Sequence, residues 1–115
     1  SDPSGNEIHL DEENKNINVT SPETVTIRAK NIVFEASESI TLKAGTDIDS
    51  KADQNITQSA GNNITISAEG NLFEKGDEKI ELIDKKINMS ATNGDMTLKA
   101  SKTIHINSGE NSNIN

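Results

Sequence analysis

The fold is decided by residues 40–71, which read ITLKAGTD, IDSKADQN, ITQSAGNN and ITISAEGN in four consecutive units of eight. The unit is apolar-x-apolar-x-small, followed by about three polar residues. The third position is apolar in 10 of 13 such units along the chain, and the fifth is Ala, Gly or Ser in 11. This alternation over five residues predicts short β-strands with one apolar face, joined by polar corners. The first position is apolar in every unit, at Ile8, Ile17, Val25, Ile32, Ile40, Ile48, Ile56, Ile64, Leu72, Ile80, Ile87, Met96 and Ile104.

Composition alone predicts a disordered chain. The 115 residues are 30% hydrophobic with a net charge of −8, which is typical of a disordered chain. The regular repeat overturns that expectation and leaves one domain of repetitive β structure. The absence of Cys excludes disulfides and zinc-thiolate sites. A pI near 4.6 argues against nucleic acid as a partner, since that binding depends on Lys and Arg.

Strands this short and narrow must stack on copies of themselves. Two arrangements are open: three units of one chain form each turn, or three chains each contribute one unit per layer. The 12 steps of a trimer would rise roughly 55–60 Å, against roughly 20 Å for a monomer with a small core. We therefore expect an all-β fold, an intertwined triple-stranded β-helix formed by a homotrimer. Its apolar core includes Ile32, Ile40, Ile48, Ile56, Ile64 and Leu72.

The units ITLKAGTD, ITQSAGNN and ITISAEGN resemble the needle of VgrG proteins, the trimeric spikes of type VI secretion systems. They are similar also to central spikes of contractile phage tails and related injection particles. The phrase Ser4-Gly5-Asn6-Glu7-Ile8-His9-Leu10-Asp11 looks like the junction between an OB-fold domain and such a needle.

This resemblance implies a structural, membrane-piercing needle that delivers effectors by sheath contraction and has no enzymatic activity. It implies assembly in the bacterial cytoplasm and expulsion to the exterior or into a target cell. It also implies transient contact with the target envelope, a possible tip-capping protein at the C-terminal end, and attachment to the secretion tube through missing N-terminal domains. The expected divisions are a junction at 1–7 after a missing OB-fold or hub region, a needle at 8–109 that is less regular at 73–95, and a loose tail at 110–115.

Three third positions break the apolar rule, namely Ser50, Gln58 and Glu74. For Ser50 and Gln58 we expect solvated polar layers in the core, because buried polar groups need partners. For Glu74 two interpretations are open. Three carboxylates can meet at the axis, where they bind a cation, hold water or share protons, or a local twist turns the side chain outward. The outward turn is supported by the cost of burying an unpaired charge. It is supported also by Phe73, which is apolar where the repeat expects a polar residue and so favours a change of register.

No catalytic residue, cofactor or metal site is expected. His9 and His105 occupy second positions and should face solvent, which leaves Glu74 and His105 as the weak metal candidates. A runner-up from another class is a monomeric β-solenoid that binds or cleaves glycans, which requires a lateral groove. The spacing of Ile80, Ile83 and Ile87 also fits a short helix, although strands are favoured because the repeat resumes at Ile87.

Overall fold

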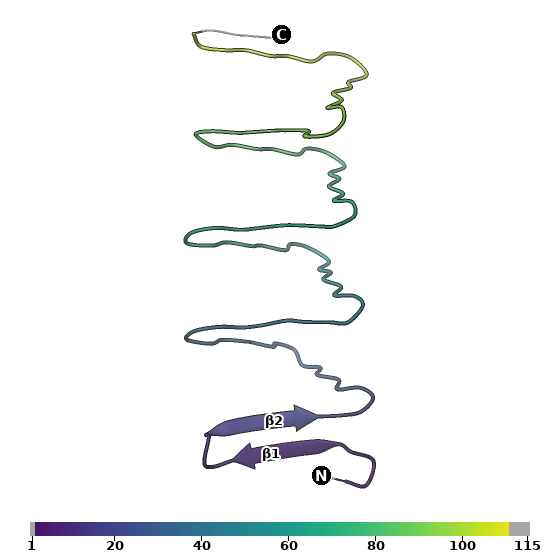
Figure 1. Ribbon diagram of the computed structural model, residues 1–115, viewed down its shortest axis with the longest axis vertical. Helices are drawn as coiled ribbons and strands as arrows, with labels where there is room; N and C mark the ends of the chain where they lie inside the picture. The colour runs from purple at the N-terminus through teal and green to yellow at the C-terminus, as the bar shows by residue number, and fades with distance from the viewer. Residues whose placement is uncertain (1, 111–115) are drawn as a thin grey trace. The chain divides into compact units, whose positions relative to one another are not determined.

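The computed structural model describes residues 2–110, and within that range the chain is extended and contains no helix. Two strands are present there, β1 (Glu7–Asp11) and β2 (Asn16–Thr20), paired antiparallel (Figure 1). The chain divides into two units, Ser1–Gln58 and Ser59–Asn115, and the hairpin belongs to the first. The triple-stranded β-helix expected from the repeat is therefore matched at the coarser level of an extended, non-helical chain.

The hairpin places its apolar side chains together. Ile8 pairs with Val19 and Leu10 pairs with Ile17, so the four share one face of the ribbon. All four remain exposed, between 57% and 72%. A two-stranded ribbon has nothing to cover this face, which is why isolated hairpins are marginally stable. Antiparallel pairing distinguishes the first two units of the repeat from the eleven that follow.

Local hydrogen bonds close the hairpin. The Asp11 carboxylate accepts hydrogen bonds from the backbone N–H of Asn14 (3.3 Å) and from its side-chain amide (2.9 Å). Lys15 completes the turn with a φ of 60°, a left-handed conformation that is uncommon outside Gly, Asn and Asp. The side-chain bond from Asn14 is the first cause, and its backbone bond the second, of a pKa of Asp11 below the ordinary 3.8.

Bends follow β2 at regular intervals through the rest of the described chain. The eleven bends ahead of the units from Val25 to Ile104 each end two residues before the first apolar position. The repeat therefore corresponds to extended segments separated by corners, and within residues 2–110 only β1 and β2 are the paired strands that the sequence predicts for every unit. The bends lie at residues 22–23, 30, 37–38, 45–46, 53–54, 61–62, 69–70, 77–78, 85, 92–94 and 101–102.

The corners continue where the sequence is less regular, although the bends that end at residues 70, 78, 85 and 94 are less evenly spaced than those before them. Bends at 77–78 and 85 bracket an extended segment, so the alternative of a short helix over residues 77–87 is not what the chain forms. Within residues 2–110 no helix has the length and apolarity that crossing a bilayer requires. The expected loose tail at 110–115 lies almost wholly outside the described residues, since 111–115 are not among them.

Gly76 sits at a tight point before the corner at 77–78. A Cβ added there would lie 2.7 Å from the carbonyl oxygen of Lys79 and 3.2 Å from Cγ1 of Ile80. Gly61 lies at a corner of the same Ser59–Asn115 unit, and a Cβ added to it would have nothing within 4 Å. The two glycines therefore differ: Gly76 permits a close backbone approach, whereas Gly61 does not need to be glycine for space.

Candidate interaction surface

The apolar stripe of the repeat is only half covered in a single chain. From Val25 onward, the first positions of the units retain 47–60% of their surface and the apolar third positions retain 60–78%. The three apolar residues at second or fourth positions, Val33, Phe73 and Ile83, retain 80–86%. The backbone thus separates a more sheltered face from a more open one, and the sheltered face is the one that the repeat predicts to turn inward.

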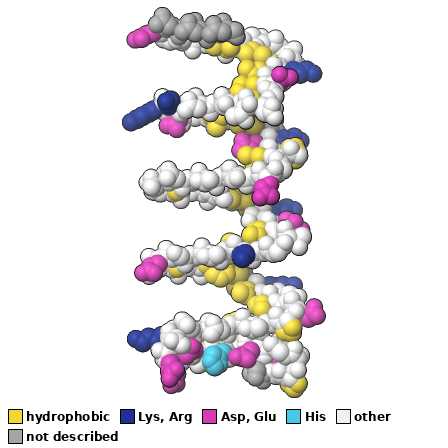
Figure 2. All heavy atoms as spheres, in the orientation of Figure 1, with side chains coloured by type: hydrophobic (Ala, Val, Ile, Leu, Met, Phe, Trp, Pro, Cys, Tyr) yellow, Lys and Arg dark blue, Asp and Glu magenta, His cyan; other side chains and the backbone are white. Residues whose placement is uncertain are grey.

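The predicted core residues all lie on this sheltered face. No described residue is buried, and hydrophobic side chains are visible at the surface of both units (Figure 2). The exposed fractions of the predicted core residues are 47% for Ile32, 57% for Ile40, 58% for Ile48, 60% for Ile56, 55% for Ile64 and 57% for Leu72.

The accessible surface of the chain is far larger than that of a folded monomer. It measures 13087 Å² for a chain of 12.4 kDa. A folded monomer of this mass exposes roughly 6,100 Å², and a fully unfolded chain roughly 18,000 Å². The observed value exceeds that of a folded monomer by about 7,000 Å².

Glu74 lies in a segment without a local change of register. The bends at 69–70 and 77–78 enclose it with the spacing of the other units. Its neighbours keep the ordinary alternation, since Leu72 is 57% exposed and Phe73 is 86% exposed. Side chains alternate between faces in an extended segment, so this pattern assigns Glu74 to the face of Leu72. Phe73 is an apolar side chain on the outer face of the single chain, and whether Glu74 meets its copies at an axis stays a prediction about the assembled protein.

Lys75, the charged neighbour of Glu74, forms an ion pair with Asp77. Lys75 Nζ lies 3.6 Å from Asp77 Oδ1, with the two side chains 87% and 91% exposed, and such an exposed pair adds little stability. Lys75 is therefore directed to the outer face. Ser50 and Gln58, the two other polar third positions, are exposed in the single chain. Their place in a polar core layer remains a prediction about the assembled protein.

The two histidines are not brought together with other metal ligands. His9 Nδ1 lies 3.6 Å from Glu7 Oε1 on β1, and His105 is exposed in the second unit. Among the described residues, no group of three or more His, Cys, Asp or Glu side chains is placed to hold a metal ion. The weak metal candidates Glu74 and His105 therefore stay predictions about the assembled protein, in which a site on the axis would take one residue from each chain.

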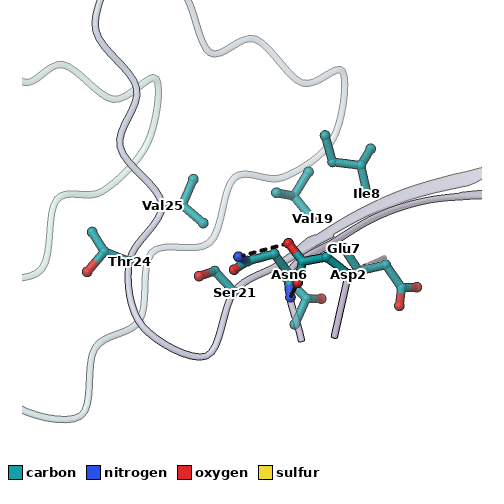
Figure 3. Close-up of a pocket in the computed structure, with 9 residues that line it drawn as sticks. Asp2, Asn6, Glu7, Ile8, Val19, Ser21, Thr24 and Val25 are labelled. Carbon is teal, nitrogen blue, oxygen red and sulfur yellow. Dashed lines mark hydrogen bonds between the residues drawn. The ribbon is translucent and has the colours of Figure 1, made fainter. Parts of the chain in front are cut away.

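An open hollow of about 550 Å³ lies at the base of the hairpin (Figure 3). The Asp2 carboxylate there accepts hydrogen bonds from the Ser4 hydroxyl and from the backbone N–H and side-chain amide of Asn6. The Ser4 bond is the largest cause of a lowered pKa of Asp2, opposed by some desolvation and aided by the Asn6 bonds. The hollow is lined by Asp2, Asn6, Glu7, Ile8, Val19, Thr20, Ser21, Thr24 and Val25.

Sequence reasoning did not single out Asp2. The available signal was the run Asp2-Pro3-Ser4-Gly5, which is typical of a turn in which an Asp side chain bonds the backbone ahead of it. Gly5 adopts a φ of 95° and completes that turn, with its N–H donating to the Asp2 carbonyl at 3.1 Å. The turn fixes the entry to β1. Four of the nine lining residues belong to β1 and β2 and the other five to the adjoining chain, and we assign no chemistry to this open hollow.

Comparison of the chain with protein-family models, with curated proteins and with solved structures gives no match.

Proposed function

We propose that three copies of this chain intertwine as a triple-stranded β-helix and serve as the membrane-piercing needle of a VgrG-like type VI secretion spike, which delivers effectors by contraction. The proposal rests on the resemblance of the repeat units to such needles and on the exposed apolar residues of the described chain. It assigns a mechanical role and no catalysis.

The observation that carries the proposal is the exposed, periodic apolar face. A single chain leaves 13087 Å² accessible, about twice what a folded protein of its mass exposes. The half-covered side chains recur with the period of the corners, so each layer presents the same apolar stripe. Identical chains wound around a common axis bring these stripes together layer by layer, and burial of apolar surface is the dominant favourable term in such association.

The same arrangement accounts for a stiff shaft. Each strand of an intertwined trimer lies between strands of the other chains, so bending requires many backbone hydrogen bonds to break together. Small residues such as Ala44, Ala60 and Ala68 at the fifth position suit a narrow axis. Three chains of charge −8 give −24. Apart from Glu74, no charged residue occupies a first or third position of a unit, so the charge lies mainly on the outer face and at the corners, where it favours solubility.

The monomeric solenoid makes a different structural demand. It requires successive units of one chain to cover one another's apolar stripe, whereas the described chain leaves every stripe residue exposed. The open hollow beside the hairpin presents Asp2 and Glu7, without an aromatic side chain for stacking on a sugar. These observations favour the trimer over a glycan-binding or glycan-cleaving monomer.

Two measurements test the proposal. Light scattering coupled to size exclusion should give three times 12.4 kDa, with early elution for that mass because a rod diffuses slowly. A compact species of 12.4 kDa would remove the trimer and with it the needle. In the producing bacterium, release of the protein should also require an intact contractile sheath. Release that is independent of the sheath would leave the trimer standing and reject the delivery role.

A further inference from the structure

The corner at residues 92–94 contains the chain's single Asn-Gly dipeptide, Asn93-Gly94. It is the widest of the eleven bends that follow β2 and precede a unit, and it separates the units that begin at Ile87 and Met96. Asn93 is exposed, and nothing lies within 4 Å of a Cβ built on Gly94. Within residues 2–110, the backbone N–H of Gly94 takes part in no backbone hydrogen bond. The reacting groups of this dipeptide are thus open to solvent and unconstrained by neighbours.

We propose that Asn93 is a site of spontaneous deamidation. The backbone nitrogen of Gly94 attacks Cγ of Asn93, and a new C–N bond closes a five-membered succinimide. The Cγ–Nδ2 bond breaks, and ammonia leaves with the proton that the Gly94 nitrogen gives up. Water then opens the ring at one of its two carbonyl carbons. The product is aspartate when the Cγ–N bond breaks and isoaspartate when the original peptide bond breaks.

Asn93 is more open to this attack than the other asparagines of the chain, because it alone is followed by glycine. The nitrogen must approach Cγ to about 3–3.5 Å, a backbone geometry that glycine reaches because it lacks a Cβ. Asn63 provides the internal comparison, because it is also exposed, lies beside the corner at 61–62 and belongs to the same Ser59–Asn115 unit. The residue after it is Ile64, whose β-branched side chain restricts the backbone and shields the nitrogen.

The reaction changes the corner in two ways. It adds one negative charge per chain, which takes the formal charge from −8 to −9. Isoaspartate also routes the backbone through the former side chain, which adds one carbon to the path between the two flanking units. The corner at 92–94 is where an extra backbone atom is most readily absorbed, since it already spans three residues. The inference rests on the corner staying at the surface of the proposed trimer, where the repeat places its polar corners.

Peptide mapping by mass spectrometry tests the site. The full chain is incubated at neutral pH and physiological temperature, with fragmentation that distinguishes aspartate from isoaspartate. The peptide containing Asn93 should gain the mass of one amide-to-acid exchange, mainly as isoaspartate, while the peptide containing Asn63 stays unchanged. The Asn93→Gln variant should lose the change, because its longer side chain closes a ring less readily.

Three results would overturn the assignment. The first is an unmodified Asn93 in the full chain when a synthetic peptide of the same sequence has already converted, because the folded corner would then protect it. The second is conversion of Asn63 at the same rate as Asn93. The third is an unchanged mass gain in the corresponding peptide of Asn93→Gln.

Discussion

The substitution Ile64→Asp tests whether the first positions of the repeat form the core of an assembly. Ile64 keeps 55% of its surface in the single chain, so this is the part that other chains must cover. Full burial of such a side chain contributes about 1.5–3 kcal/mol, so covering the rest contributes about 0.8–1.7 kcal/mol per chain and about 2.5–5 kcal/mol per trimer. Since about 1.4 kcal/mol is a factor of ten, the trimer constant should fall by roughly two to four orders of magnitude. The three new carboxylates add a further penalty, because each is buried without a partner.

Thr65→Asp is the matched control, because Thr65 is the next residue, is exposed and points to the opposite face. An exposed substitution of this kind changes stability by about 0.5 kcal/mol or less. Mass by light scattering across a dilution series, together with thermal melts, measures both variants. Ile64→Asp should dissociate at concentrations where Thr65→Asp remains trimeric. Equal losses in the two variants would refute the assignment of the inward face.

Three further predictions concern individual residues. Glu74→Leu should raise the melting temperature of the trimer, because replacing an inward charge by an apolar group stabilises by on the order of 1–4 kcal/mol; an unchanged melt would place Glu74 on the outer face. Gly76→Ala should lower the stability of the trimer by about 1–3 kcal/mol, and with it the melting temperature, because the new Cβ would lie 2.7 Å from a backbone carbonyl oxygen. Gly61→Ala should leave the melting temperature unchanged, and equal melting temperatures for the two variants would contradict the close approach at Gly76. The lowered pKa of Asp11 means that its contribution to the hairpin is present above pH 3.8 and is lost as the pH falls through the lower folded value. Amide chemical shifts of Asn14 should therefore move only in that acidic range, and Asp11→Asn should abolish the titration.

The sequence predicts the corners well, because their chemistry is local. Runs such as Gly61-Asn62-Asn63 and Glu69-Gly70-Asn71 are turn formers, and the bends fall on them. The alternation of apolar and polar residues likewise predicts which face is sheltered, and the exposed fractions of Leu72 and Phe73 differ in the expected sense. The period can be recognised in the sequence because every unit needs the same turn-forming residues at its corner and the same alternation of apolar and polar residues.

Elsewhere the sequence left alternatives that local pattern does not resolve. The helical spacing of Ile80, Ile83 and Ile87 is compatible with a helix, yet the chain keeps bends at 77–78 and 85 and stays extended. Tertiary context routinely overrides such a short pattern. The two interpretations of Glu74, an axial site and an outward turn, both stay predictions about the assembled protein, and the bends on both sides have the ordinary spacing.

The sequence by itself determined the repeat, the positions of its corners and the face that carries the apolar stripe, because these depend on neighbours within one unit. The tertiary structure decided how particular units differ. Ile8 and Ile17 belong to units whose segments pair antiparallel, which the repeat does not distinguish from the units that follow. Strand direction depends on which segment folds back alongside, and an eight-residue pattern does not encode that.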